Sequence, residues 1–398
     1  MHVRSTPEAI APLSESPESP SSGERFAGHS PSHQPAGNME NQPCEKNGID
    51  EEEAALYDRQ IRLWGVEAQN RMRRSSVLII NLRGIATEAC KNIVLAGVGS
   101  ITILDPDKVL PEDLGAGFFF REEDIGQRRV DAAKKRLHSL NPRVNVTGLT
   151  DDIESKIAED GFLQSFDIVC LTDSSSSVIQ RVNSCCRRAQ KPFFAAASLG
   201  IHGYIFADLL DHTYISEREK KLDNGEVKKT SEKRNQEFIP FDVSLKSKLK
   251  SHYPTATQEG FAIALGMSRY VRESDSFTNG HVLTVRIDSS ALFELQSKCN
   301  VNYPEGDKHV SELIDISDQL LKAREIHDPL VPQDLLRQLA MTSKAEFIPS
   351  CAVVGSILSQ EVLNALGGKQ APLANFLVFD GEKCSGDIYA LGVQRDQS

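Results

Sequence analysis

Three predicted elements, a strand, a helix and a second strand, follow one another in residues 77–104 and restrict the fold more than any other feature. The apolar runs 77–80 and 101–104 predict buried strands, and residues 87–96 carry apolar side chains at helical spacing until Gly97 ends the helix. Strands joined through a helix run parallel, with a right-handed crossover. The chain is therefore expected to form an α/β fold with a mostly parallel sheet.

The same alternation continues along the rest of the chain. We expect one long helix over 51–74, because this stretch has no proline and begins with acidic residues. The apolar pattern predicts further helices at 130–140, 178–188, 257–271, 314–323 and 352–366, and further strands at 145–149, 167–171, 193–197, 203–210, 376–379 and 388–391. Together these elements describe a doubly wound, Rossmann-like α/β domain.

Two segments fall outside this pattern. Residues 1–50 contain seven of the 18 prolines and no Trp or Tyr. Such a stretch buries too little apolar surface to offset its ordering entropy, so we expect a disordered tail. Residues 217–235 are almost wholly polar, which predicts a loop insertion with basic clusters. The remainder, 51–398, is expected to form one domain.

Composition disfavours several classes of function. The 45 Lys and Arg against 56 Asp and Glu give a formal net charge of −11, which argues against nonspecific nucleic-acid binding. No apolar run approaches the ~18 residues of a membrane span, and no signal peptide is expected. The eight cysteines form no C-x-x-C pair. A disulfide scaffold and a zinc ribbon are therefore not expected, and a reducing cytosolic or nuclear compartment fits best.

The first strand–helix turn, residues 81–86, lies where a doubly wound fold binds phosphate. It reads Asn-Leu-Arg-Gly-Ile-Ala, so only Gly84 remains of the G-x-G-x-x-G pattern whose backbone N–H groups approach the anion. We expect Leu82 and Ile85 to crowd a pyrophosphate. The scaffold is that of a nucleotide binder with a disabled loop, which disfavours a dehydrogenase and a self-sufficient ATPase.

Two acidic residues end predicted strands near this turn. Asp105 stands where a carboxylate would bind a ribose hydroxyl, and Asp173 where one would bind a metal ion. Taken alone, each is more often a turn residue or a helix cap. Cys351 and the pair Cys185-Cys186 are candidate nucleophiles by residue type, but they lie in helical stretches and are expected to be buried. No metal site is expected.

Four stretches resemble one family, the ubiquitin-like-protein activating enzymes. They are YDRQIRLWG at 57–65, LDPDKVLPEDLGAGF at 104–118, CAVVGSILSQEVLNAL at 351–366 and NFLVFDG at 375–381. Within that family they are most similar to the smaller, non-adenylating subunits of heterodimeric SUMO-activating enzymes. The resemblance covers residues 51–398 in order and implies an adenylation fold of the ThiF/MoeB type.

The resemblance also implies a division of labour between two related folds. The larger half binds ATP and Mg²⁺, adenylates the modifier and carries the thioester cysteine, while this chain is the degenerate half. It is implied to bind no cofactor itself, to contact SUMO only indirectly and to work in the nucleus and cytoplasm, with Gly84, Asp105 and Asp173 as vestiges. Arg59, in the Y-D-R-Q motif, is implied to reach the partner's ATP in trans, where a guanidinium suits phosphate oxygens.

Three other functions fit the sequence less well than this one. A nicotinamide-dependent oxidoreductase and a stand-alone activator of a sulfur-carrier protein both need an intact glycine loop, and the second usually has a four-cysteine zinc site. The regulatory subunit of the neddylation enzyme carries a large helical insertion, for which 398 residues leave no room. Each alternative lacks a feature that it requires.

Overall fold

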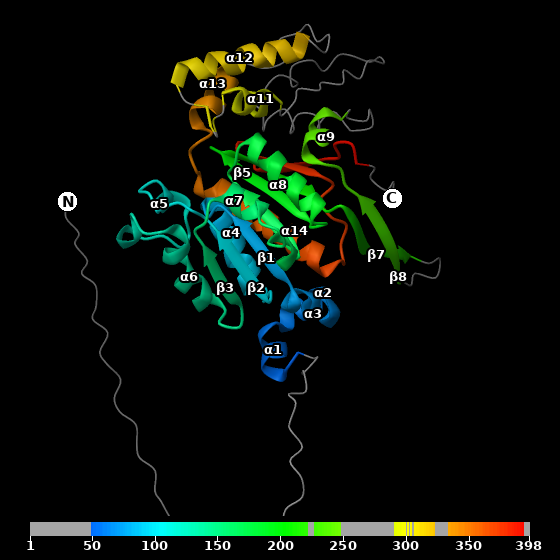
Figure 1. Cartoon of the computed structure of the whole chain (residues 1–398). Helices are drawn as coiled ribbons and strands as arrows, with labels where there is room; N and C mark the ends of the chain where they lie inside the picture. The colour runs from blue at the N-terminus through cyan, green and yellow to red at the C-terminus, as the bar shows by residue number, and fades with distance from the viewer. Residues whose placement is uncertain are drawn as a thin grey trace, which may run out of the picture. The chain divides into compact units, whose positions relative to one another are not determined.

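The computed structural model describes residues 49–221, 227–247, 290–299, 301, 303–304, 306–322 and 333–393. Its centre is a sheet (Figure 1). The described strands of this sheet have the order β10-β9-β6-β5-β4-β1-β2-β3. Their bounds are β1 Ser76–Ile80, β2 Ser100–Leu104, β3 Asn145–Leu149, β4 Ile168–Thr172, β5 Phe193–Leu199, β6 His202–Asp208, β9 Phe376–Asp380 and β10 Ser385–Tyr389. Strands β1 to β5 pair in parallel, and β6, β9 and β10 add antiparallel strands beyond β5.

Helices cover both faces of this sheet because its strands are apolar on both sides. Val77 and Ile79 of β1 face a core formed with α4 (Gly84–Leu95), α6 (Arg129–Leu140) and α14 (Ile348–Gly367). Leu78 and Ile80 face a second core. That core is formed with α7 (Ile153–Ala158), α8 (Ser176–Arg188), α9 (Phe241–Lys246), α11 (Ser290–Cys299), α12 (Gly306–Lys322) and α13 (Gln333–Thr342). Burial on both faces is typical of parallel sheets, and the doubly wound fold is confirmed.

The prediction of one continuous helix over 51–74 is wrong, because the helix is interrupted twice. The structure has α1 (Glu51–Leu56), α2 (Asp58–Trp64) and α3 (Val66–Arg74). Gly65 has φ 82, a left-handed value that glycine adopts without strain. The helix that carries Arg59, α2, is therefore separate from α1 and α3.

The polar stretch 217–235, predicted to be a loop insertion, is mostly strand. It belongs to a separate two-stranded antiparallel sheet of β7 (Asp211–Lys221) and β8 (Val227–Glu237). The backbone ladder forms although the side chains are polar, and buried Tyr214 and Phe238 anchor its base. Polar composition concealed the strands because the ladder needs only backbone groups.

Other boundaries differ slightly from those predicted. The helix expected at 87–96 begins at Gly84, the one at 352–366 begins at Ile348, and the one at 314–323 is the end of a helix that begins at Gly306. The short helix α5 (Asp113–Ala116), along with α7, α9, α11 and α13, was not predicted. The proposed tail up to residue 48 and the predicted helix 257–271 lie outside the described residues. None of the described helices combines the length and apolarity that crossing a membrane requires.

Candidate functional site

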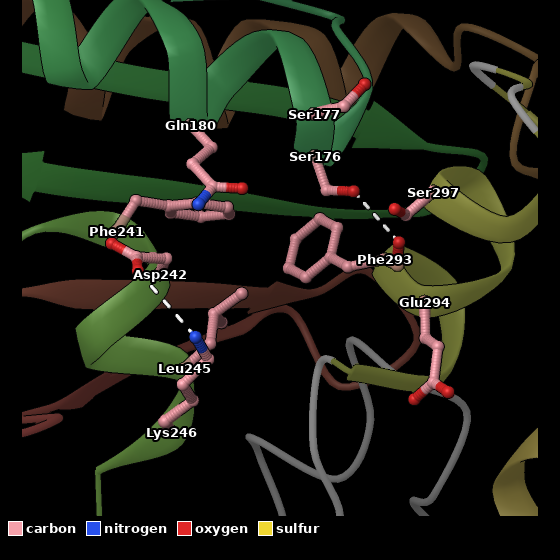
Figure 2. A pocket seen from close by; sticks show the side chains of 10 residues that line it. All are labelled: Ser176, Ser177, Gln180, Phe241, Asp242, Leu245, Lys246, Phe293, Glu294 and Ser297. Carbon is pink, nitrogen blue, oxygen red and sulfur yellow. Dashed lines mark hydrogen bonds and ion pairs between the residues drawn. The ribbon is translucent and has the colours of Figure 1, made fainter.

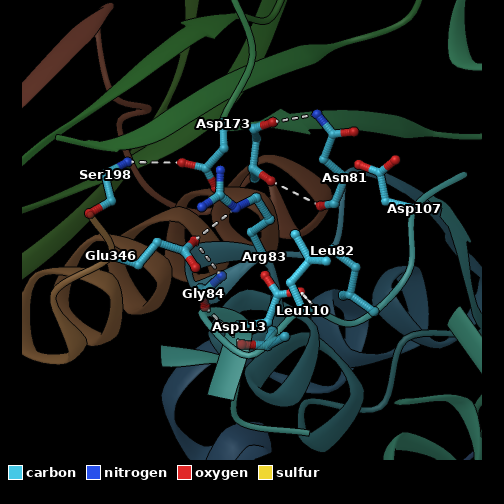
Figure 3. A network of polar contacts seen from close by, with 12 residues as sticks. Asn81, Leu82, Arg83, Gly84, Asp107, Leu110, Asp113, Asp173, Ser198 and Glu346 are labelled. Carbon is cyan, nitrogen blue, oxygen red and sulfur yellow. Dashed lines mark hydrogen bonds and ion pairs between the residues drawn. The ribbon is translucent and has the colours of Figure 1, made fainter. Parts of the chain in front are cut away.

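A cavity of about 880 Å³ opens beyond the carboxyl ends of β1, β2 and β4. This is the edge at which doubly wound folds bind ligands. Asn81, Arg83, Asp173, Tyr303 and Glu346 are among the residues that line it, and Figure 3 shows most of them around the turn between β1 and α4. We therefore take this cavity as the candidate nucleotide site.

A smaller cavity of about 210 Å³ lies between α8, α9 and α11 (Figure 2). Phe241 and Phe293 form its apolar wall, and their rings lie edge to face with centroids 5.5 Å apart. The Ser176 hydroxyl donates to the carbonyl oxygen of Phe293 at 2.8 Å. These contacts hold α11 against α8, so this cavity is explained by packing between helices.

The turn between β1 and α4 points its apolar side chains away from the cavity. Leu82 and Ile85 are both fully buried in the core under α4. The expectation that they would crowd a pyrophosphate is therefore wrong. Asn81 adopts φ 66, and its side-chain amide donates to the Thr172 carbonyl and to the Ser174 hydroxyl, both at 2.8 Å. These bonds turn the chain so that the next residue faces inward.

The backbone donors of this turn are already bonded to carboxylates of the same chain. The Leu82 N–H donates to Asp105 Oδ2 at 2.6 Å, and the Gly84 N–H donates to Glu346 Oε1 at 2.9 Å. Gly84 itself is required by packing, since a Cβ there would lie 2.9 Å from Cys351 Sγ. The one glycine left in the turn therefore has a structural reason to be there, and its N–H is occupied.

Asp105 is fully buried and serves the fold with both of its oxygens. Besides the bond from Leu82, its Oδ1 accepts from the Asp107 N–H at 2.7 Å. Arg129 Nη1 lies 3.5 Å from Asp105 Oδ2, and its guanidinium also binds Asp113 through two hydrogen bonds. Burial raises the pKa of Asp105, although Arg129 and the backbone donors oppose that shift. Both oxygens of Asp105 are therefore already engaged within the chain.

Arg129, a cation on the cavity wall, is likewise bound to carboxylates of its own chain. Burial alone would lower its pKa, but the hydrogen bond to Asp113 and the charge of Asp105 outweigh burial and raise it. Its Nη1 also lies 3.3 Å from Asp107 Oδ2. Three carboxylates therefore hold this guanidinium within the chain, where it would have to break charge-assisted bonds to bind a phosphate.

Asp173, which directly follows β4, has a buried oxygen that is unused. It has φ 47, its Oδ1 accepts from the Ser198 N–H at 3.1 Å, and its Oδ2 is buried without a hydrogen-bond partner among the described residues. Burial and the negative charge of Glu346 raise its pKa to about 7, against the opposing charge of Arg83. Below neutral pH this group is therefore largely protonated.

We expect Asp173→Asn to stabilise the protein at neutral and higher pH. The folded-state pKa of Asp173 is raised from its ordinary value of 3.8 to about 7, so ionisation at this site destabilises the fold as the pH rises between those values. Asparagine keeps the oxygen that accepts from Ser198 and tolerates a positive φ. The gain in free energy of unfolding should grow from pH 5 to pH 8, measured by urea denaturation. An equal difference at both pH values would contradict this assignment.

The charge of the cavity does not suit a nucleotide. Among its described lining residues seven are carboxylates and three are cations, namely Asp107, Glu112, Asp113, Asp152, Glu154, Asp173 and Glu346 against Arg83, Arg129 and Lys344. Arg83 is paired with Glu346, its Nε lying 3.4 Å from Oε1. A triphosphate is negatively charged, so the excess of carboxylates along this cavity would repel it. The residues present therefore do not fit ATP with Mg²⁺.

Arg59 lies far from this cavity, on helix α2. The Gln60 side chain donates to the carbonyl of Leu95, the last residue of α4, whereas the cavity adjoins the first residue of that helix. The 12 residues of α4 place its two ends roughly 16 Å apart. Arg59 is exposed and, within the described part of the chain, makes no hydrogen bond or ion pair. Its guanidinium is available to another molecule and not to this chain's own cavity.

Tyr57 fixes the start of the helix that carries Arg59. It is buried, and its hydroxyl accepts from the Asn141 side-chain amide at 2.7 Å. Gly97 lies against the ring, because a Cβ there would come within 2.4 Å of the Tyr57 hydroxyl oxygen.

We expect Tyr57→Phe to lower the free energy of unfolding by about 1 kcal/mol, the usual net value of one hydrogen bond. The Asn141 amide would keep its second acceptor, the Val94 carbonyl at 2.9 Å, which limits the loss. Chemical denaturation measures the change. A loss above about 3 kcal/mol would mean that the ring, and not only the hydroxyl, has moved.

Apolar side chains are exposed around Arg59. The exposed fractions are 60% for Leu56, 70% for Leu63 and 52% for Val66. Trp64, by contrast, packs against the core of its own chain. Leu63, and not Trp64, is therefore available to contact another protein. Large apolar side chains exposed on neighbouring helices suit an interaction site.

The candidate nucleophilic cysteines are mostly buried, as expected. Cys351 and Cys186 are buried, and Cys185 is partly exposed. Burial raises the pKa of Cys351 to about 12, which keeps its thiol protonated and unreactive.

One cluster with metal-ligating side chains escaped the sequence analysis. Cys299, His309 and Glu312 place ligand atoms within 4.8 Å of one another. The Cys299 thiol donates to Glu312 at 3.2 Å, and Lys298 lies 3.6 Å from the same carboxylate. These contacts already engage the Cys299 thiol and the Glu312 carboxylate within the chain.

Known proteins are similar to this chain over most of its length. The ThiF family model matches residues 57–396. SUMO-activating enzyme subunit 1 of Homo sapiens is 36% identical over 362 residues, covering 87% of this chain and 97% of that protein. DNA damage tolerance protein RHC31 of Saccharomyces cerevisiae is 32% identical over 344 residues, covering 84% and 95%.

A crystal structure of E. coli MccB aligns with 14% identity and a TM-score of 0.46, over 84% of this chain and 71% of that one. A likeness of that size adds nothing to the description of the fold. The family match and the relatives do, because they span nearly the whole described domain. The chain belongs to the ThiF family and is a homologue of SUMO-activating enzyme subunit 1.

Proposed function

We propose that this chain is the non-adenylating subunit of a SUMO-activating heterodimer. Relatives named SUMO-activating enzyme subunit 1 align with this chain over 97% of their own length. In this role it supports the ATP-dependent adenylation of SUMO and its transfer to a thioester by a larger, cysteine-bearing subunit. The reaction is the first step of protein sumoylation. We expect the chain to act in the nucleus and cytoplasm.

The observation that carries the proposal is the state of the turn at residues 81–84. Its Leu82 and Gly84 N–H groups, which would bind phosphate in a working site, are bonded to Asp105 and Glu346 of the same chain. ATP and Mg²⁺ therefore belong to the partner subunit in this proposal. Gly84, Asp105 and Asp173 are vestiges that now serve the fold.

The second part of the proposal concerns Arg59. An exposed guanidinium on a short helix, unpaired within the described chain and surrounded by exposed apolar side chains, suits a residue that meets its ligand across an interface. There it would hydrogen-bond phosphate oxygens of the partner's ATP and stabilise charge that shifts onto the leaving pyrophosphate. Supplied in trans, it makes adenylation depend on assembly. Leu56, Leu63 and Val66 would bury their side chains against the same partner.

Reconstitution tests this function. This chain and the larger subunit are purified separately and assayed for SUMO-dependent ATP–pyrophosphate exchange, alone and mixed. We expect neither to exchange efficiently alone and the mixture to do so, with both chains eluting together on size exclusion. Exchange by this chain alone would favour a stand-alone activator. For an oxidoreductase, the cavity offers no glycine-rich turn, and absence of nicotinamide binding would dismiss it.

A further inference from the structure

Glu346 stands out because its carboxylate lies at the N-terminus of α4, where a nucleotide-binding fold holds phosphate. Its Oε1 accepts from the Gly84 N–H at 2.9 Å, and the Arg83 Nε lies 3.4 Å away on the other side (Figure 3). The side chain is 7% exposed. A partial positive charge from the helix, one backbone donor and one guanidinium are the groups that a phosphate would use.

Backbone hydrogen bonds on both sides of Glu346 fix the position of this residue. Ala345 accepts from the Gly200 N–H at 3.1 Å, and its own N–H donates to Thr342 at 2.9 Å. Glu346 also forms an isolated bridge with Gly200 at the end of β5. The segment before α14 is thereby tied to the sheet and directs the side chain across the cavity floor.

We propose that Glu346 is a built-in anion that takes the place of nucleotide phosphate and so excludes phosphate from the N-terminus of α4 in this half of the enzyme. This inference rests on the proposed function, since it explains why the ATP of the heterodimer is confined to the partner. The apolar residues of the turn do not exclude phosphate, because Leu82 and Ile85 face the core. The exclusion is both steric and electrostatic: the carboxylate occupies the Gly84 donor and repels a second anion.

A phosphate surrogate and an ordinary helix cap respond differently when the carboxylate is removed. A capping carboxylate only stabilises the helix, so its loss lowers stability whether or not an anion is present. A phosphate surrogate leaves behind a site that an added anion can fill. The variant should therefore be less stable than wild type and should regain stability when pyrophosphate is added, by the usual linkage of binding to folding.

The test uses the full-length chain, alone and in the heterodimer, with pyrophosphate as the probe. We expect Glu346→Ala to bind pyrophosphate at least about tenfold more tightly than wild type in isothermal titration, through the freed Gly84 donor and Arg83. Its melting temperature should rise with pyrophosphate concentration, while that of wild type should not. Glu346→Gln, which keeps an acceptor oxygen at Gly84 but loses the charge, should fall between them.

Glu361→Ala is the matched control, because it also removes a glutamate that accepts from a backbone N–H, that of Leu373 at 2.7 Å, but near the other end of α14. It should be destabilised without recovery by pyrophosphate. If neither Glu346 variant gains affinity or stability with pyrophosphate while wild type stays unresponsive, the inference is wrong and the proposed function stands. If wild type alone binds Mg-ATP tightly, the proposed function itself fails. Should the alanine variant not fold, the glutamine variant carries the test.

Discussion

Replacing Arg59 with alanine is expected to slow SUMO-dependent ATP–pyrophosphate exchange by the heterodimer on the order of ten- to a hundredfold. The reason is the loss of a charge-assisted hydrogen bond to phosphate, worth ~1.5–3 kcal/mol. The side chain is exposed and makes no contact of this kind within the described chain, so folding and assembly should be unaffected. Arg59→Lys should recover only part of the rate, since the ammonium lacks the planar fork of a guanidinium.

Arg62 provides a matched control on the same helix. It is also an exposed arginine, but it pairs with Asp58 at 3.0 Å, a local surface pair of small energetic value. Arg62→Ala should exchange pyrophosphate at nearly the wild-type rate. Size exclusion confirms that each variant forms the complex. An Arg59→Ala complex that exchanges at the wild-type rate would show that Arg59 is only a surface residue.

Replacing Leu63 with glutamate is expected to weaken assembly with the larger subunit by at least about thirtyfold, as for an interface hot spot worth ~2 kcal/mol. Leu63 is 70% exposed in this chain, so the isolated protein should keep its melting temperature. Burying an unpaired carboxylate against an apolar partner surface is costly. Surface plasmon resonance with immobilised larger subunit measures the dissociation constant.

Val243→Glu is the corresponding control, since this valine is 44% exposed and lies on α9, packed on the other face of the sheet. It should not change the affinity. If Leu63→Glu binds as tightly as wild type, the apolar surface around α2 is not the interface. Loss of affinity in both variants would instead indicate a general effect of added negative charge.

The parallel core of the fold could be predicted from sequence because its strands are uninterrupted apolar runs. Segments such as 77–80 and 101–104 allow few other interpretations once a helix lies between them. The hairpin at 211–237 could not be predicted in the same way. Its strands carry mostly polar side chains, and their pairing is a backbone property that composition does not reveal.

The candidate site was predicted in part. The sequence identified the eroded turn and the two aspartates that end neighbouring strands, and the structure brings Asp105 and Asp173 to the same edge of the sheet. The prediction that Leu82 and Ile85 crowd a pyrophosphate was wrong, because both side chains face the core. The positive φ of Asn81, which turns the chain before Leu82, is not evident from the sequence. Glu346 was missed altogether. It lies 262 positions from Gly84 in the sequence, so only tertiary structure reveals their contact.

The central claim is that nucleotide binds to the partner and not to this chain. Isothermal titration with Mg-ATP tests it most directly, first on this chain alone and then on the purified heterodimer. We expect no measurable binding to the isolated chain and one nucleotide per heterodimer. A micromolar dissociation constant for the isolated chain, or two nucleotides per heterodimer, would contradict the account and would make Asp105 and Asp173 working ligands.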